Sequence, residues 1–323
     1  MRIAVTGSIA TDHLMKFPGR FEDQLIADKL DKVALSFLVD ELQIRRGGVA
    51  ANIAFGLAGL GLRPLLIGSA GADFAEYRAW LDRHGVDTSG VRESMLRHTA
   101  RFVATTDSVG NQIASFYAGA MSEDRDIDLA PLCAGGVDLV LIGATDPDAV
   151  LRFSAQCRSL GLAFAADPSW QLARFEGPQV HDLVDGAAYL FSNEYEGALI
   201  ERKTGWSAAE VLSHVGVRVT TLGGDGARVE QAGQPPVEVG PVPDAVLAEP
   251  TGAGDAFRSG FLAAVAWGLS HERAAQLGNL LAVHALETVG TQEYDLKPGP
   301  LAERCADAYG EDAAEEIAAH LTS

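Results

Sequence analysis

Short apolar runs alternate with longer segments of helical pattern along this chain, and that alternation restricts the fold more than any other feature. The apolar runs are continuous, as in strands buried on both faces of a sheet. We expect strands over residues 3–7, 64–71, 137–144, 163–167, 188–193 and 218–224. We expect helices over residues 49–60, 73–83, 147–160, 194–203, 207–215, 254–268 and 271–288. Strands that alternate with helices predict an α/β fold with a doubly wound, mostly parallel sheet flanked by helices.

Two segments interrupt this alternation. Residues 14–45 contain no clear strand–helix unit, and residues 98–118 have the pattern of two β-rich arms around the turn DSVGN. We interpret both as a small β-sheet inserted into a single domain of residues 1–323, because no repeat or low-complexity linker divides the chain. Ligands of open α/β sheets bind at the carboxyl edge of the strands, so the small sheet is expected to form a lid over that edge.

Charge and hydropathy argue against several kinds of partner. The chain of 323 residues carries a formal net charge of −19, so nonspecific binding to nucleic acid or to an anionic membrane is not expected. No apolar run approaches the roughly 20 residues that span a bilayer, and the N-terminus has the pattern of a first strand. The three cysteines, Cys133, Cys157 and Cys305, lie far apart in apolar segments, as reduced thiols do. We expect a soluble, cytoplasmic protein.

Several common active-site motifs are absent from the sequence. It contains no G-x-x-x-x-G-K-[ST], no G-x-G-x-x-G after the first expected strand and no G-x-S-x-G. No group of His and Cys residues has the spacing of metal ligands. These absences argue against a P-loop enzyme, a dinucleotide-binding fold, a serine hydrolase of the elbow type and a zinc site.

The stretch TGAGD at residues 251–255 opens one of the expected helices. Glycines let a backbone approach a ligand closely, and the free N–H groups of a first helical turn attract an anion. Asp255 beside such a turn can take a proton from a hydroxyl while the turn holds a phosphoryl group. Taken alone, Asp255 is better explained as an acidic residue that stabilises the helix start.

Three further patterns each have a structural and a functional interpretation. Gly47 and Gly48 open a helix that carries Asn52, which either caps that helix or binds a hydroxyl of a polyol. Asn193 and Glu196 follow a strand, where they form a helix cap or serve a ligand. The stretch TTLGGDG at 220–226 ends a strand in a glycine turn, which alone indicates only a hairpin.

Together and in this order, these stretches resemble the ribokinase-like (PfkB) family of carbohydrate kinases over essentially the whole chain. GGVAAN is similar to the first signature of that family, and PTGAGDAF is a specific match to its second. The stretches VTGSIATDHLMKFPGRF, SFLVDELQIRRGGVAAN, HTARF and QIASFY are similar to bacterial adenosine kinases of the actinobacterial type. The resemblance implies a ribokinase-like fold with a small β-sheet lid. It also implies transfer of the ATP γ-phosphate to the 5′-hydroxyl of adenosine, which gives AMP for purine salvage.

The resemblance assigns a role to each matching residue. Asp255 is the expected general base, and the backbone of Gly252, Ala253 and Gly254 is the expected anion hole. The residues expected to bind the nucleoside are Ser8, Asp12, Ser36, Gly48, Asn52, Phe102, Phe116 and Gln171. Among these, Asp12 would accept hydrogen bonds from ribose hydroxyls, and the two Phe rings would stack on the purine. The residues expected beside ATP are Asn193, Thr221, Gly223 and Gly226, with Glu196 acting on Mg²⁺ through water.

Three positions affect how closely the binding properties of this chain are expected to follow those of the family. Glu249 stands where the second signature usually begins with Asp, near a monovalent-cation site in relatives, which leaves a dependence on K⁺ open. Trp170 stands beside Gln171 where a second Gln is expected, which would replace a hydrogen bond to the base by stacking. Arg174 is either a phosphate contact or a surface residue.

Two alternatives to an adenosine kinase remain at this point. One is a sugar kinase of the ribokinase or fructokinase type, and the other is a non-catalytic nucleoside-binding protein on the same fold. Exposed β edges are usually paired or covered, and relatives often dimerise through their lid strands. The sequence therefore predicts a homodimer formed through the lid.

Overall fold

Two separate β-sheets form the framework of the protein, which is described by a computed structural model over residues 1–323 except 26–30, 33, 322 and 323. The larger sheet has the strand order β13-β12-β11-β10-β9-β8-β1-β4-β5 in the described residues. Its strands are β1 (Ile3–Thr6), β4 (Leu65–Gly71), β5 (Asp87–Ser94), β8 (Leu139–Ile142), β9 (Ala163–Ala166), β10 (Tyr189–Asn193), β11 (Val217–Thr221), β12 (Ala227–Glu230) and β13 (Val237–Val239). Neighbours from β5 to β11 pair in parallel, and β12 and β13 pair antiparallel at one edge. The expected mostly parallel α/β sheet is confirmed.

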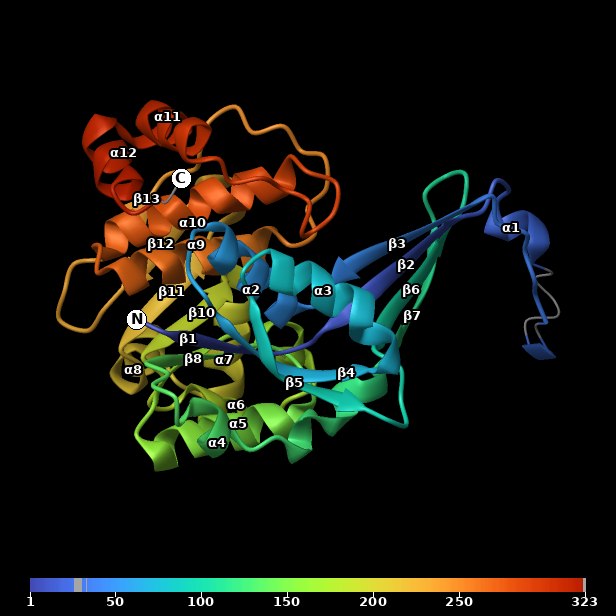
Figure 1. Cartoon of the computed structure of the whole chain (residues 1–323), viewed down its shortest axis with the longest axis horizontal. Coiled ribbons are helices and arrows are strands. Elements are labelled where there is room, and N and C mark those ends of the chain that lie inside the picture. The colour runs from blue at the N-terminus through green and yellow to red at the C-terminus, as the bar shows by residue number, and fades with distance from the viewer. Residues whose placement is uncertain (26–30, 33, 322–323) are drawn as a thin grey trace.

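Helices cover both faces of the larger sheet (Figure 1). One layer holds α2 (Val49–Gly59), α3 (Ala75–Arg83), α9 (Ala253–Trp267), α10 (His271–Leu286), α11 (Pro298–Tyr309) and α12 (Glu311–Ala318). The other holds α4 (Leu129–Cys133), α5 (Pro147–Leu160), α6 (Gly177–Val184), α7 (Glu194–Thr204) and α8 (Ala208–His214). None of the helices within the described residues combines the length and the apolarity that crossing a bilayer requires.

The strands of the sheet divide their side chains between two hydrophobic clusters. In β4, Leu65 and Ile67 belong to one cluster and Leu66 to the other, because successive side chains of a strand point to opposite faces. Both faces are therefore buried, which explains why the strands are continuous apolar runs in the sequence. The three cysteines are buried and form no disulfide.

Local signals explain why the helix α5 has the bounds that the sequence predicts. The side chain of Asp146 accepts hydrogen bonds from the backbone N–H groups of Asp148 and Ala149, and Pro147 occupies the first turn. Gly161 ends the helix in the left-handed conformation with φ of 66°, which favours glycine. Several other elements were not expected from the sequence, namely the partly polar strand β5, the antiparallel strands β12 and β13 and the helices α4, α6, α11 and α12.

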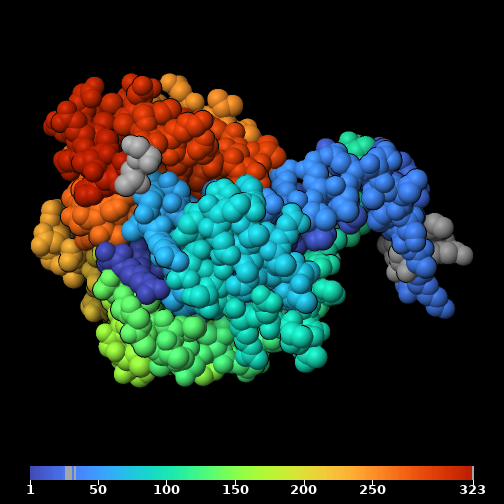
Figure 2. Space-filling model, in the orientation of Figure 1, coloured from blue at the N-terminus to red at the C-terminus, as the bar shows by residue number. Residues whose placement is uncertain are grey.

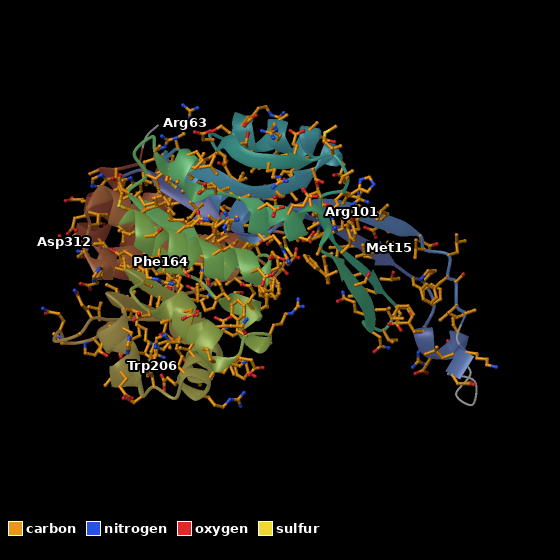
Figure 3. All side chains as sticks on the ribbon, turned by 90° about the horizontal axis from the view of Figure 1, so that it is seen from below. Met15, Arg63, Arg101, Phe164, Trp206 and Asp312 are labelled. Carbon is orange, nitrogen blue, oxygen red and sulfur yellow. The ribbon has the colours of Figure 1, made fainter. Side chains whose placement is uncertain are left out.

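The smaller sheet has the strand order β3-β2-β6-β7 and stands away from the body as an arm (Figures 1 and 2). Its strands are β2 (Ala10–Lys16), β3 (Glu41–Gly47), β6 (Ala100–Thr106) and β7 (Gln112–Tyr117). We call this sheet the lid. Figure 3 places Arg101 where the lid joins the body and Met15 further along the arm.

The hairpin expected within 98–118 forms from β6 and β7. Asp107 in its turn accepts hydrogen bonds from the backbone N–H groups of Val109 and Asn111. The other lid segment differs from the expected 14–45. Its strands β2 and β3 continue beyond these bounds to Ala10 and Gly47, because the pairing of β2 with β3 and with β6 continues to the base of the lid.

Candidate active site

A cavity of about 770 Å³ lies between the lid and the carboxyl edge of the larger sheet. Its walls come from β2, β6 and β7 of the lid, from the start of α2, from the segment after β9 and from the start of α9. The lining residues are Ser8, Ala10, Asp12, Gly48, Val49, Asn52, Phe102, Phe116, Ala118, Met121, Trp170, Arg174, Thr251, Asp255 and Thr291. Segments far apart in the sequence therefore meet at the edge where open α/β sheets bind ligands.

One row of lid side chains faces this cavity. Asp12 of β2 is paired with Arg45 of β3 on one side and with Phe102 of β6 on the other. Phe102 is in turn paired with Phe116 of β7. Paired residues of a sheet point to the same face, so a carboxylate and two aromatic rings are presented side by side to the same space.

The start of α2 contributes a closely packed glycine and a polar side chain. Gly48 has φ of 98°, and a Cβ there would lie 2.5 Å from the carbonyl oxygen of Ser8, so only glycine fits. The hydroxyl of Ser8 accepts a hydrogen bond of 3.0 Å from the backbone N–H of Val49. One turn of helix further, Asn52 is buried beneath the cavity.

The glycine turn before α9 brings a carboxylate to the cavity floor. Gly252 has φ of 84°, and a Cβ there would meet the side chain of Thr291 at 2.7 Å. The helix begins at Ala253, and Asp255 lies in its first turn. Asn52 Nδ2 donates a hydrogen bond of 2.9 Å to Asp255 Oδ2. Burial raises the pKa of Asp255 to about 6, and the Asn52 hydrogen bond and the Arg258 charge oppose a further rise.

A buried ion pair lies behind this turn. Arg258 Nη2 is 2.6 Å from Asp167 Oδ1, and both side chains are buried. A Cβ on Gly254 would lie 2.8 Å from Arg258 Nη1, so the guanidinium is against the backbone of the glycine turn. Burial raises the pKa of Asp167, and the Arg258 charge opposes that rise. Neither residue was expected from the sequence, since nothing local links positions that are 91 residues apart.

Glu249 joins the body to the lid. Its Oε2 lies 2.7 Å from Arg45 Nη1 of β3 and accepts a hydrogen bond of 3.1 Å from the backbone N–H of Gly290. Burial and then the negative charge of Glu249 raise the pKa of Asp12 to about 6, whereas the charge of Arg45 lowers it. The position that departs from the family signature is thus part of a cluster of two carboxylates and one guanidinium.

The residues expected beside ATP lie at the same edge of the sheet, outside the cavity lining. Asn193 at the end of β10 is paired with Thr221 at the end of β11. Asn193 and Glu196 exchange hydrogen bonds of 2.7 and 2.9 Å between side chain and backbone, which is the helix-capping interpretation. In the turn after β11, Gly223 and Gly226 have φ of 59° and 93°.

Two expected nucleoside contacts are not brought to the cavity. Ser36 is exposed near the outer end of the lid, next to Phe37, whose ring packs on Phe17 and Phe21. Gln171 is buried, and its Nε2 donates to the carbonyl oxygen of Thr145. The neighbours of Gln171, Trp170 and Arg174, line the cavity instead, because the short helical turn at 169–173 points Gln171 inward.

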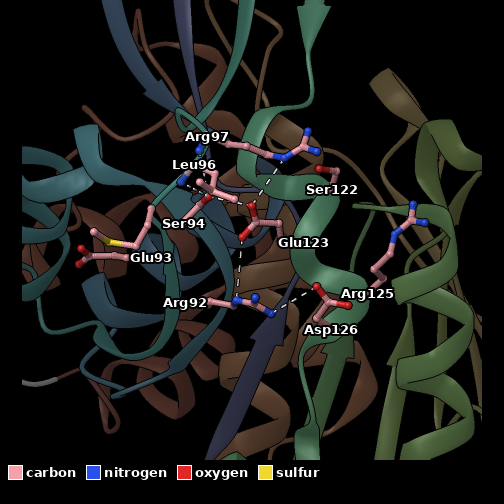
Figure 4. Close-up of a pocket in the computed structure, with 10 residues that line it drawn as sticks. Arg92, Glu93, Ser94, Leu96, Arg97, Ser122, Glu123, Arg125 and Asp126 are labelled. Carbon is pink, nitrogen blue, oxygen red and sulfur yellow. Dashed lines mark hydrogen bonds and ion pairs between the residues drawn. The ribbon is translucent and has the colours of Figure 1, made fainter.

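A second hollow, of about 680 Å³, lies beside β5 and the segment 119–126 (Figure 4). Glu123 and Asp126 form ion pairs with arginines of the same hollow. Glu123 accepts a hydrogen bond of 2.7 Å from Ser94 Oγ and lies 3.6 Å from Arg97 and 3.9 Å from Arg92. Because these charges are already neutralised, this hollow has less to offer an anionic or polar ligand than the cavity under the lid.

The sheet topology, the separate lid and the carboxylate in a glycine-rich helix start define a kinase of the ribokinase-like fold. Residues 11–297 match the family described as pfkB family carbohydrate kinase, so the chain belongs to that family. The nucleoside kinase of Burkholderia thailandensis, solved in complex with inosine, is 30% identical with a TM-score of 0.83, over 95% of this chain and 98% of that chain. Its complex with ADP-inosine is also 30% identical, with a TM-score of 0.81 over 95% of this chain and 96% of that chain.

A further relative is the nucleoside kinase of Methanothermobacter thermautotrophicus. It is 28% identical over 271 residues, which are 82% of this chain and 86% of that protein. The chain is therefore an ATP-dependent kinase of the pfkB family with nucleoside kinases among its relatives. The resemblance to adenosine kinases of the actinobacterial type stays a prediction.

Proposed function

We propose that this kinase transfers the γ-phosphate of ATP to the 5′-hydroxyl of adenosine and so forms AMP and ADP, the chemistry of purine salvage. The observation that carries the proposal is the half-buried carboxylate of Asp255 at the start of α9, on the floor of a cavity whose opposite wall holds Phe102 and Phe116. The Burkholderia thailandensis enzyme, solved with inosine, supports a purine nucleoside as the acceptor.

The arrangement of the cavity suggests how the nucleoside would lie. Asp12 would accept hydrogen bonds from the ribose hydroxyls, with Gly48 and Asn52 against the same ring. The base would stack between Phe102, Phe116 and Trp170. With the ribose so held, the 5′-hydroxyl would point toward the floor of the cavity.

The proposed reaction uses the glycine turn and Asp255 in different ways. The backbone N–H groups of Gly252, Ala253 and Gly254 would hold the γ-phosphoryl group at the positive end of α9. Asp255 would take the proton of the 5′-hydroxyl while that oxygen bonds to the γ-phosphorus and the bond to the bridging oxygen of ADP breaks. The negative charge of Asp255 thus serves the hydroxyl rather than the phosphate.

We expect Mg²⁺ to bind together with ATP, so that its charge neutralises the phosphates. Within the described residues, no group of three or more His, Cys, Asp and Glu side chains is placed to hold a metal ion. Glu196 uses one carboxylate oxygen in its helix cap, which leaves the other to reach the ion through water. Asn193, Thr221, Gly223 and Gly226 would line the ATP side.

The proposal gives K⁺ a minor role. The carboxylate of Glu249 already faces the guanidinium of Arg45 and the N–H of Gly290, so its negative charge has a partner within the protein. We expect similar turnover in KCl and in choline chloride. A large stimulation by K⁺ alone would show that a cation is needed beside Glu249.

A substrate panel tests the acceptor. Purified protein with Mg-ATP should form ADP much faster with adenosine than with inosine, ribose or fructose. Faster turnover of inosine would keep a nucleoside kinase and overturn the adenosine preference. Faster turnover of a free sugar would make the protein a sugar kinase, and binding of adenosine without turnover would leave a nucleoside-binding protein.

We also propose that two copies of the chain associate through their lids. The face of the lid opposite the Asp12 row carries exposed apolar side chains, among them Leu42, Ile44 and Ile113. Among the residues that the structure describes, β3 and β7 are the free edges of this sheet, and free edges tend to be paired or covered. A second copy of the same face would cover both features.

A further inference from the structure

A line of buried hydrogen bonds connects the base of the lid to Asp255. The Tyr77 hydroxyl donates to the carbonyl oxygen of Gly47, the last residue of β3, at 2.9 Å. Gln292 Nε2 lies 2.5 Å from that hydroxyl and 2.9 Å from Asn52 Oδ1. Asn52 Nδ2 donates to Asp255 Oδ2 at 2.9 Å. The line joins side chains from α2, from α3 and from the segment after α10 at one point under the cavity.

Donors and acceptors along this line fit in one direction only. An ionised carboxylate accepts hydrogen bonds and donates none, so Asn52 must turn its NH₂ group toward Asp255. Its carbonyl oxygen then faces Gln292, which must present its own NH₂ group. The two hydrogens of that group serve Asn52 and Tyr77, and the single hydroxyl hydrogen of Tyr77 goes to Gly47.

Gln292 is the donor on which the orientation of Asn52 depends. The hydroxyl of Thr291 also lies 2.9 Å from Asn52 Oδ1, but it is 3.0 Å from the carbonyl oxygen of Arg46 as well. A threonine hydroxyl has one hydrogen and can donate it to only one of these oxygens. Gln292 is 1% exposed, so water has little access to replace its N–H groups.

We propose that Gln292 is a positioning residue of phosphoryl transfer, which fixes the Asn52 amide so that its NH₂ group holds the Asp255 carboxylate in place. The proposal rests on the proposed role of Asp255 as the general base. Asn52 then has a second N–H left for the ribose, so one amide orients both the base and the nucleoside. Without Gln292, the Asn52 oxygen keeps only the Thr291 hydroxyl, whose single hydrogen is shared with the Arg46 carbonyl oxygen, so the orientation of the amide is held less firmly.

The consequence for Asp255 has a definite sign. A hydrogen bond donated to the ionised carboxylate favours that form, so its loss raises the pKa of Asp255 above the present value of about 6. The base is then protonated at a higher pH. The acidic limb of the kcat profile should move upward by about one pH unit, whereas the KM for ATP should not change.

The variant Gln292→Met tests this, because methionine has a similar size and no donor. We expect the acidic limb to move upward by about one pH unit, so that kcat falls about tenfold at pH values below the limb and only about twofold at neutral pH. The matched control is Gln276→Met in α10, a buried glutamine whose side chain pairs with Arg273 and is remote from the cavity. That control should keep the pH profile of the unchanged protein, which separates positioning from a general loss of packing.

Further outcomes separate this inference from the proposed function. If Asp255→Asn retains turnover, Asp255 is not the base and the proposed function fails. If Asp255→Asn is inactive while folded Gln292→Met leaves the acidic limb in place, only the role of Gln292 is overturned. Should Gln292→Met not fold, Tyr77→Phe keeps the ring in place and removes one end of the line; a smaller upward shift supports the inference, and an unmoved limb rejects it.

Discussion

At the scale of single residues, the guanidinium of Arg258 is the positive charge that lies beside two carboxylates of the site. Asp255 and Asp167 both lie close enough to Arg258 for its charge to lower their pKa values, and Arg258 is itself buried. A buried charge without a partner is unfavourable, and each of these groups is compensated by the others. The guanidinium therefore has a structural role and an electrostatic role at the same position.

Replacement of Arg258 should affect both roles. The variant Arg258→Met leaves the carboxylate of Asp167 buried without its partner, which should lower the free energy of unfolding by roughly 3–5 kcal/mol. Urea denaturation followed by circular dichroism measures this loss. The exposed pair of Arg228 and Glu238 provides the control, since Arg228→Met should change stability by less than about 1 kcal/mol. A loss no larger than that of the control would mean that the pair contributes little.

The pH dependence of turnover follows from two carboxylates with raised pKa values. Asp12 and Asp255 each have a pKa of about 6 in the free protein, and the proposed mechanism needs both ionised. As the pH falls through this value both become protonated, so log(kcat/KM) for the nucleoside should fall with a slope that approaches two.

The variant Asp12→Asn separates the two carboxylates. It should reduce that slope to one while the acidic limb of kcat, which reports Asp255 in the complex, stays in place. Initial rates measured across pH 5 to 8, roughly the range in which these groups titrate, provide the comparison. A slope of one in the unchanged protein would show that only one of the two carboxylates must be ionised.

At the scale of elements, the lid and the body are joined through β3. This strand ends at Gly47 and continues through Gly48 directly into α2, so the lid base and the floor of the cavity are one stretch of chain. The ion pair between Arg45 and Glu249 adds a second link, from β3 near the base of the lid to the segment before the glycine turn. A movement of β3 would therefore reach Asp12, Asn52 and the turn together.

The two members of this link should shift the titration of Asp12 in opposite directions. Glu249→Gln removes a nearby negative charge, so the pKa of Asp12 should fall and the acidic limb of kcat/KM should move to lower pH. Arg45→Met removes the positive charge, so the pKa of Asp12 should rise and that limb should move to higher pH. Profiles that move in the same direction for both variants would show that the link acts through structure rather than through charge.

The elements also show what local sequence can and cannot predict. The helix α5 has the bounds that were expected, and Asp146, Pro147 and Gly161 mark its ends within the segment itself. The ends of β2 and β3 were not expected, because they are set by the pairing of β2 with both β3 and β6. Gln171 was placed in the site by resemblance, but the turn that carries it points its side chain inward and exposes Trp170.

The same contrast between local signals and long-range contacts applies to the active site. The glycine turn and Asp255 were found from a contiguous motif. The contacts that set the chemistry of Asp255 were not, because Asn52 and Asp255 are 203 residues apart and Gln292 lies 240 residues from Asn52. Such contacts depend on how the helices pack on the sheet, and no pattern within one segment reports them.

At the scale of the whole molecule, the lid has two faces of different character. The inner face carries Asp12, Phe102 and Phe116 toward the cavity, whereas the outer face has apolar residues with no cover from the body. Leu42 is 55% exposed, Ile44 is 62% exposed and Ile113 is 50% exposed. Apolar groups gathered on one face of a sheet with free edges are typical of an association surface.

The proposed homodimer makes a prediction about mass and activity together. Light scattering of the unchanged protein should give twice the mass of one chain at every concentration used for assay. Ile44→Asp places a charge at the centre of the outer face and should give a monomer, because an unpaired charge in an apolar interface is unfavourable. The control Leu96→Asp changes a residue on the body that is 91% exposed, and it should remain a dimer.

Since the lid carries Asp12 and both Phe rings, a monomer whose lid has lost its partner should also have a higher KM for the nucleoside and an unchanged KM for ATP. A protein that is monomeric before any substitution would refute the proposed association.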